Sequence, residues 1–162
     1  MLGHPAHWIA LGFGSGLSPW APGTVGTLWG WMAFLALQPW LDDLQWAWVI
    51  AGGVLVGWWA CTVTARRLSA PDPGAVVWDE IIAFWLVLWL VMPAGLWTQL
   101  SVFALFRVFD AVKPGPVAWA DACFKVRAGE PIGWAQGFGI LFDDVVAAFC
   151  TLIVVALWRW WQ

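Results

Sequence analysis

Two pairs of adjacent carboxylates stand at the start of long apolar stretches of this sequence. Asp79 and Glu80 precede a run from 81 to 97 that contains no charged residue, and Asp143 and Asp144 begin another apolar run. A charged side chain placed in lipid costs roughly 2.5–3.5 kcal/mol on insertion scales, so acids at such boundaries are candidates for function. The two pairs therefore come first in the search for a reactive site.

Basic groups that could bind a phosphate accompany these acids. Arg107 and Asp110 close a third apolar run and are three residues apart, so they would share one face of a helix. The planar fork of an arginine matches two phosphate oxygens, and Lys113 adds a second positive charge. For each pair alone, a structural salt bridge or a solvated helix cap is the favoured interpretation, but together they indicate a site.

Carboxylates gathered at one place require a counter-charge. They repel one another unless several are protonated or a divalent cation lies among them. Hard oxygen ligands favour Mg²⁺ or Mn²⁺ over zinc, and the two terminal histidines, His4 and His7, with no cysteine cluster, do not indicate a zinc site. We predict a Mg²⁺ site and a catalytic group, either general base or covalent nucleophile, drawn from Asp79, Glu80, Asp110, Asp143 and Asp144.

A glycine-rich segment near the N-terminus could present backbone N–H groups to an anion. Residues 12–19 read Gly-Phe-Gly-Ser-Gly-Leu-Ser-Pro, and Thr24 is expected to be the N-cap of the next helix. A loop of this kind entering a helix N-terminus can bind phosphate, although a flexible surface loop is an equal alternative. The candidate phosphate-binding groups here are Ser15, Gly16, Ser18 and Thr24.

One further match to a phosphatase pattern is a coincidence by our interpretation. Cys61 and Arg67 have the C-x5-R spacing of cysteine-dependent phosphatases. That chemistry needs a loop wrapped around the phosphate, whereas residues 62–66 contain no glycine and are typical of a helix end.

The composition is that of an integral membrane protein. Of the 162 residues, 62% are hydrophobic and 10% are charged, where soluble domains carry about 25% charge. No cleavable secretory signal is recognisable. We expect one all-α domain over residues 1–162: a membrane-embedded helical bundle of about five apolar helices, preceded by a re-entrant or interfacial N-terminal segment.

The hydropathy pattern and the Pro and Gly residues predict where these helices lie. The fourth is short enough that it need not cross the membrane, and residues 117–137 are typical of a polar amphipathic segment or loop. The expected helices are approximately 24–36 (extending to 40), 45–65, 77–92 (extending to 97), 98–112 and 140–161.

The positive charges predict an orientation in the membrane. With residue 1 in the cytoplasm and five alternating helices, only Arg159 of the 7 Lys and Arg residues falls outside. The same arrangement places the glycine-rich segment and all the candidate acids on the cytoplasmic side. The basic residues on that side are Arg66, Arg67, Arg107, Lys113, Lys125 and Arg127.

An ordered set of short motifs resembles the phosphatidylglycerophosphatase A family. The motifs spread over residues 11 to 144, nearly the whole chain, and each is weak alone. The chain departs from the family pattern near the last motif. The family usually has a second glycine close before that motif, where this chain has Gln136-Gly137-Phe138, and within the motif Leu141 replaces a methionine. The matching stretches are 12–19, Pro22-Gly23-Thr24-Val25-Gly26, Val77-Trp78-Asp79-Glu80, Phe106-Arg107-Val108-Phe109-Asp110 with Lys113-Pro114, and Gly139-Ile140-Leu141-Phe142-Asp143-Asp144.

The resemblance implies a Mg²⁺-dependent, all-helical enzyme of the bacterial inner membrane that converts phosphatidylglycerophosphate to phosphatidylglycerol. The phospholipid substrate and the membrane are the expected partners, no nucleic acid is expected, and homo-oligomerisation is left open. The alternative is a proton- or ion-coupled membrane carrier, since intramembrane acids also mark ion paths. The motifs of the CDP-alcohol transferases and of the other large lipid-phosphatase family are absent.

Overall fold

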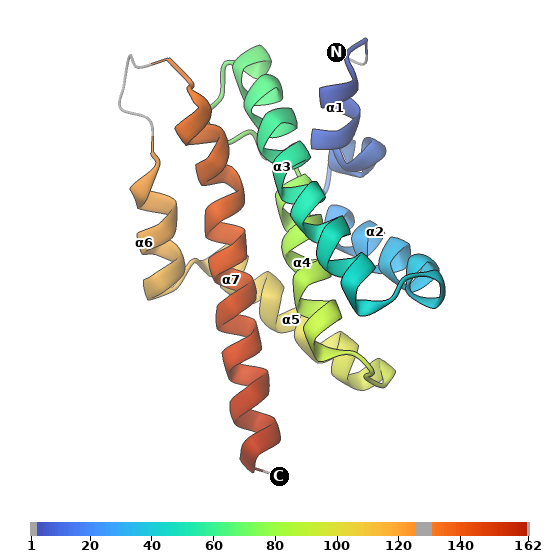
Figure 1. Cartoon of the computed structure of the whole chain (residues 1–162). Helices are drawn as coiled ribbons and strands as arrows, with labels where there is room; N and C mark the ends of the chain where they lie inside the picture. The colour runs from blue at the N-terminus through green and yellow to red at the C-terminus, as the bar shows by residue number, and fades with distance from the viewer. Residues whose placement is uncertain (1–2, 126–130, 162) are drawn as a thin grey trace.

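The structure, a computed structural model, describes residues 3–125 and 131–161, and over those residues it contains helices and no strands. Figure 1 shows two long helices, α3 and α7, with α4 between them. The elements are α1 (Pro5–Ala10), the 3₁₀ helix η1 (Gly12–Leu17), α2 (Pro22–Leu37), the 3₁₀ helix η2 (Gln38–Trp40), α3 (Asp43–Leu68), α4 (Trp78–Val91), α5 (Leu96–Val112), α6 (Gly115–Cys123) and α7 (Trp134–Trp161).

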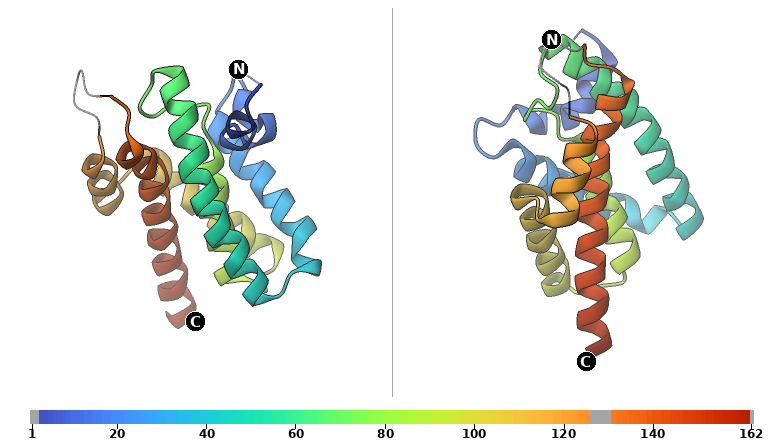
Figure 2. Two further views of the ribbon diagram at one scale, coloured as in Figure 1. Left: turned by 45° about the horizontal axis from the view of Figure 1, so that its top comes forward. Right: turned by 90° about the vertical axis from the view of Figure 1, so that its left-hand side faces the viewer.

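Helix α4 is the centre of the bundle. It is apolar around its whole circumference after the first turn, which is the pattern of a helix surrounded by protein. Helices α7, α2, α3 and α5 all pack against it, and Ile81, Phe84 and Leu88 are completely buried. The two views of Figure 2 show α6 alongside α7 and the N-terminal helices beside α3.

The ends of the helices follow from local sequence. Asp42 and Gln45 form a reciprocal capping box at the start of α3. Helix α2 begins at Pro22, whose fixed φ suits the first helical position, and Ala21 is its N-cap. The prediction that Thr24 caps this helix is therefore wrong, because Thr24 lies inside its first turn.

Two helices, rather than about five, have the length and composition to cross a membrane in the described residues: α3, with 26 residues, and α7, with 28. Helices α2, α4 and α5 have 16, 14 and 17 residues. They stop early because Pro39, Pro93 and Gly95 interrupt the apolar stretches. An apolar helix inside a protein and one inside lipid have the same composition, which explains the difference from the expected number.

The remaining segments differ in detail from expectation. The N-terminal segment is not a spanning helix, as predicted, but it forms the short helices α1 and η1. Residues 117–137 are largely helical, with α6 first and the start of α7 at Trp134, and residues 126–130 lie outside the described part.

Candidate functional site

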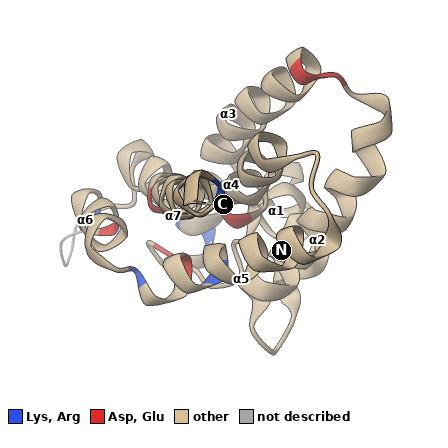
Figure 3. Ribbon diagram, turned by 90° about the horizontal axis from the view of Figure 1, so that it is seen from below, with Lys and Arg blue, Asp and Glu red and all other residues tan. Residues whose placement is uncertain are grey.

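The predicted acids come together where α4, α5 and α7 pack. Asp79 and Glu80 lie in the first turn of α4, Asp110 lies near the end of α5, and Asp143 and Asp144 lie in α7. Figure 3 shows acidic and basic residues around these helices, with further acids at the distant end of α3. The packing of α4 against α5 and α7 thus unites residues that are far apart in the sequence.

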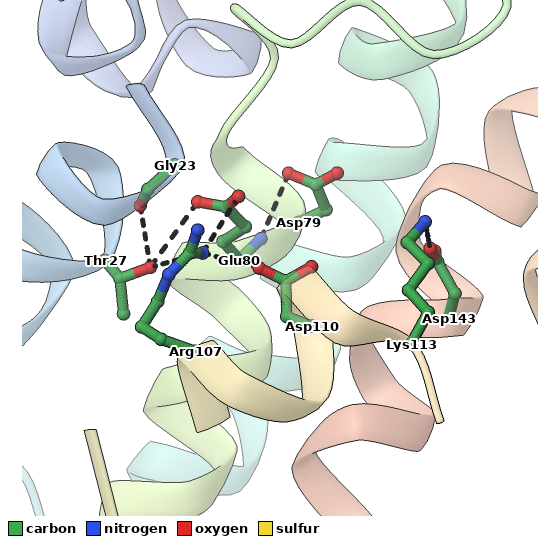
Figure 4. Close-up of polar contacts among 8 residues, drawn as sticks. All are labelled: Gly23, Thr27, Asp79, Glu80, Arg107, Asp110, Lys113 and Asp143. Atoms are coloured by element: carbon green, nitrogen blue, oxygen red, sulfur yellow. Dashed lines mark hydrogen bonds and ion pairs between the residues drawn. The ribbon is translucent and has the colours of Figure 1, made fainter. Parts of the chain in front are cut away.

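Arg107 connects two of these acids. Its Nη1 atom lies 3.0 Å from Glu80 Oε1 and 2.5 Å from Asp110 Oδ2, and Figure 4 shows the guanidinium between α2 and α4. Burial raises the pKa of Glu80 to about 7, although the charge of Arg107 acts in the opposite direction. Glu80 and Asp110 already have a cationic partner in this structure.

Lys113 connects a second group of acids. Its Nζ lies 2.6 Å from Asp143 Oδ2 and 2.7 Å from Asp121 Oδ1, so it joins the last turn of α6 to α7. Lys125 also pairs with Asp121. Burial lowers the pKa of Lys113, but the hydrogen bonds to Asp121 and Asp143 outweigh it and leave that pKa above its usual value. The ammonium group is therefore charged at neutral pH.

Two acids at the site have no ion-pair partner among the described residues. Asp144 is 3% exposed, and its Oδ2 atom is buried without a hydrogen-bond partner in the described structure. Its strongest electrostatic neighbours are Asp110, Asp79 and Glu80, all of the same charge. Within the described part of the chain, Asp79 accepts a hydrogen bond only from the Glu80 amide, at 3.0 Å, and burial together with Glu80 raises the pKa of Asp79.

This imbalance suits a divalent cation. Four buried carboxylates and the half-buried Glu80 face two cations, Arg107 and Lys113, so the site carries excess negative charge. The donors are all carboxylate oxygens, the chemistry that Mg²⁺ prefers, and Asp144 offers a buried oxygen with no partner. Over the described residues, no three His, Cys, Asp or Glu side chains already surround one point closely enough to hold a metal. The donor set therefore fits Mg²⁺ chemically, and binding would draw the carboxylates closer together.

Sequence reasoning missed two residues of α2 beside the Arg107–Glu80 ion pair. Thr27 is completely buried on α2, and its hydroxyl lies 3.4 Å from both Arg107 Nη1 and Glu80 Oε2. Gly23 lies one turn earlier, where a Cβ would stand 2.0 Å from Glu80 Oε1. The available signal was their four-residue spacing, which places both on one face of α2.

A pocket of about 210 Å³ opens beside the acids. It lies between α6, α7 and the segment that joins α3 to α4. Its polar lining includes Asp72, Asp121, Lys125, Gln136 and Asp143. Asp143 thus contacts both Lys113 and an open space large enough for a small polar group.

Comparisons with known proteins show the family of this chain. The sequence profile of the phosphatidylglycerophosphatase A family matches residues 8–159. This chain belongs to the phosphatidylglycerophosphatase A family. The phosphatidylglycerophosphatase A proteins of Escherichia coli and Haemophilus influenzae are 38% and 36% identical to it, over 90% and 98% of this chain and 78% and 91% of theirs.

A third relative carries a different name. A putative phosphatidylinositol-3-phosphatase of Bacteroides thetaiotaomicron is 36% identical over 94% of this chain and 92% of its own length. No solved structure matches the chain.

Within this family member the glycine-rich segment supports α4. The Val77 amide donates to Ala10 O at 2.9 Å, and a Cβ on Gly16 would stand 2.1 Å from Ala75 O. Only glycine permits that approach of two backbones just before Asp79.

The groups of this segment that we predicted to bind phosphate make hydrogen bonds to neighbouring residues. The Gly16 amide donates to Leu11 O, the Ser15 hydroxyl donates to Gly12 O, and the exposed Ser18 hydroxyl donates to Trp20 O. These bonds lie within the segment itself, so the phosphate role of Ser15, Gly16, Ser18 and Thr24 stays a prediction.

The departures from the family pattern before Asp143 do not interrupt the helix. Residues 134–144 belong to α7, and Leu141 is buried. At Gly137 a Cβ would stand 1.7 Å from Thr62 Oγ1, so α7 comes very close to α3 at this point.

Proposed function

We propose that this protein is a membrane-embedded phosphatidylglycerophosphatase, which removes the terminal phosphate of phosphatidylglycerophosphate. The observation that carries the proposal is the meeting of five carboxylates with Arg107 and Lys113 in a chain of this family. A hydrolase of a phosphate monoester needs cations for the phosphoryl oxygens and a base or nucleophile beside them, and this site offers both.

Mg²⁺ is the cofactor we propose. Asp79 and Asp144 would hold it first, since neither has a cationic partner, with Asp110, Asp143 and Glu80 as further candidate ligands. When bound, the ion polarises a phosphoryl oxygen or lowers the pKa of a water.

The chain's own residues bind and orient the phosphate. Arg107 can turn part of its fork from Asp110 to two phosphate oxygens, since a guanidinium has five donors. Lys113 neutralises charge beside Asp143. A carboxylate of the site either accepts the proton of a water that attacks phosphorus, which releases phosphate and phosphatidylglycerol, or attacks phosphorus itself and releases phosphatidylglycerol. In the second case water then hydrolyses the acyl phosphate, which frees phosphate and restores the carboxylate.

We place α3 and α7 across the inner membrane, with the site toward the cytoplasm. Exposed apolar side chains follow one face of α7, at Phe149, Ile153 and Leu157. Arg159 donates to the carbonyl of Val91, at the end of α4 opposite to the acids. Arg107, Lys113 and Lys125 pair with acids at the site end, which supports this orientation by the positive-inside rule.

Phosphate release from the lipid tests the proposal. Purified protein should release phosphate from phosphatidylglycerophosphate, and Asp79→Asn and Asp144→Asn should each lower kcat by at least about 100-fold. Asp43→Asn, at the exposed start of α3, is the control and should behave as wild type. Near-normal activity in both site variants would contradict the proposal.

Substrate choice and the carrier alternative need separate assays. Phosphatidic acid and phosphatidylinositol 3-phosphate should be poorer substrates than phosphatidylglycerophosphate, the second being chosen because of the name of the Bacteroides relative. The comparisons give no support to the carrier. Vesicle flux without phosphate release would nevertheless reinstate it.

A further inference from the structure

The hydroxyl of Thr27 lies at the junction of three helices. It is completely buried on α2 and faces Glu80 of α4 and Arg107 of α5 (Figure 4). Buried polar groups are normally satisfied within their own helix or by one partner. Thr27 is satisfied within α2 and still lies against an ion pair.

The hydrogen bonds show which way the hydroxyl points. Thr27 Oγ1 has one hydrogen and two acceptors within reach, Gly23 O at 2.8 Å and Glu80 Oε2 at 3.4 Å, and the shorter contact assigns the hydrogen to Gly23. Its lone pairs are then left for Arg107 Nη1, which can donate across 3.4 Å. The bond to Gly23 thus fixes Thr27 as an acceptor toward the arginine.

We propose that Thr27 is a positioning residue that holds the guanidinium of Arg107 in the orientation needed for the substrate phosphate. This inference rests on the proposed phosphatase function. In the resting protein Arg107 is also held by Glu80 and Asp110. When phosphate replaces one of these carboxylates, Thr27 still accepts a hydrogen bond from Arg107. Because Thr27 is neutral, it does not compete with the phosphate for the positive charge of the guanidinium.

The physical effect is one of geometry. A guanidinium that is free to swing still attracts a phosphate as a point charge, but it no longer presents two parallel donors to the oxygens. Misplacement of such a group lowers the rate of the chemical step more than the affinity. Loss of the hydroxyl should therefore reduce kcat and leave KM nearly unchanged.

The first experiment compares threonine variants in the lipid phosphatase assay. Thr27→Ala and Thr27→Ser both lose the methyl group and differ by the hydroxyl. We expect kcat to fall by about 10- to 100-fold in Thr27→Ala, with KM changed less than about threefold, and Thr27→Ser to stay within about threefold of wild type.

Thr151→Ala is the matched control. Thr151 is also completely buried and also donates to the carbonyl four residues earlier, Ala147 O at 2.9 Å, but it belongs to the far half of α7. It should retain wild-type kinetics. Equal losses in Thr27→Ala and Thr151→Ala, or a Thr27→Ser no better than Thr27→Ala, would overturn the proposal.

A second measurement does not depend on activity. The shifts in thermal unfolding midpoint caused by Thr27→Ala and Arg107→Lys should be clearly non-additive in the double variant, because the two side chains touch. The shifts of Thr151→Ala and Arg107→Lys should add. Additive shifts for Thr27→Ala and Arg107→Lys would refute the inference. A wild-type protein that is inactive on the lipid would refute the proposed function, but the coupling between the two residues could still be measured.

Discussion

At Gly23 the absence of a side chain decides how close α2 comes to the site. A Cβ there would lie 2.0 Å from Glu80 Oε1 and 2.6 Å from Oε2. Any residue with a Cβ at position 23 would fill the space that the Glu80 carboxylate occupies when it pairs with Arg107.

Gly23→Ala should displace Glu80 from Arg107. We expect kcat/KM to fall at least about tenfold and stability to fall by about 1–3 kcal/mol, as in other overpacked sites. Phosphate release and thermal unfolding measure these changes. Gly52→Ala in α3 is the control, because a Cβ there meets nothing within 4 Å, and an equal loss in both variants would contradict the explanation.

The acids divide at the residue scale into paired and unpaired ones. Glu80 has a cationic partner and Asp79 has none in the described structure. Asp79→Asn should raise the Mg²⁺ concentration needed for half-maximal activity by about 10-fold or more, as expected for loss of a metal ligand. Glu80→Gln should lower kcat with little change in that concentration. If a Mg²⁺ titration shows that Glu80→Gln raises this concentration and Asp79→Asn does not, then Glu80 is the metal ligand and Asp79 is not.

At the scale of elements, α6 is tied to α7 through one lysine. Lys113 ends α5 and joins Asp121 of α6 to Asp143 of α7. Burial is the largest single effect on the pKa of Asp121 and raises it. Lys113 and Lys125 together outweigh burial and hold that pKa below its usual value. The link adds to the packing of Trp119 of α6 against Phe142 of α7.

Lys113→Gln should loosen α6. The side chain is 29% exposed, so screening limits the expected loss of stability to about 1–2 kcal/mol. Lys125→Gln is a control that shares the partner Asp121, but its side chain is 68% exposed and the loss should stay below about 0.5 kcal/mol. Chemical unfolding of both variants tests the difference, and equal effects would show that burial of the lysine does not matter.

At the scale of the whole molecule, exposed apolar side chains lie on α2, α3, α5 and α7, and the acids of the site lie toward one end. Cys123 is exposed at the end of α6, Cys61 is buried and Cys150 is half-buried. A Cys150→Ala variant therefore keeps one accessible thiol on the side of the site.

We predict the sidedness of that thiol. In the Cys150→Ala protein, an impermeant maleimide should label Cys123 in inside-out vesicles and leave it unmodified in intact spheroplasts. Permeabilised spheroplasts are the control for reagent access. Labelling from the periplasmic side would place the site on the opposite face and overturn the proposed orientation.

Removal of metal is the second test at this scale. EDTA should abolish phosphate release, and Mg²⁺ should restore it, because the site has more buried carboxylates than cations. Full activity after exhaustive chelation would contradict the proposed cofactor.

The sequence by itself determined the helical class and the candidate acids, basic groups and family motifs. Asp79, Asp110 and Asp144 were recognisable because a carboxylate is costly beside apolar runs and so stands out in a chain with 10% charged residues. Most helix ends followed from Pro, Gly and capping residues, which act over a few positions and are visible locally.

Only the tertiary structure decided which acids are paired, how Thr27 and Gly23 meet Arg107 and Glu80, and which apolar helices face the outside. These properties depend on contacts between segments distant in sequence, so no local pattern contains them. Hydropathy cannot separate α4, which is surrounded by protein, from α7, which exposes an apolar face, because both environments exclude water.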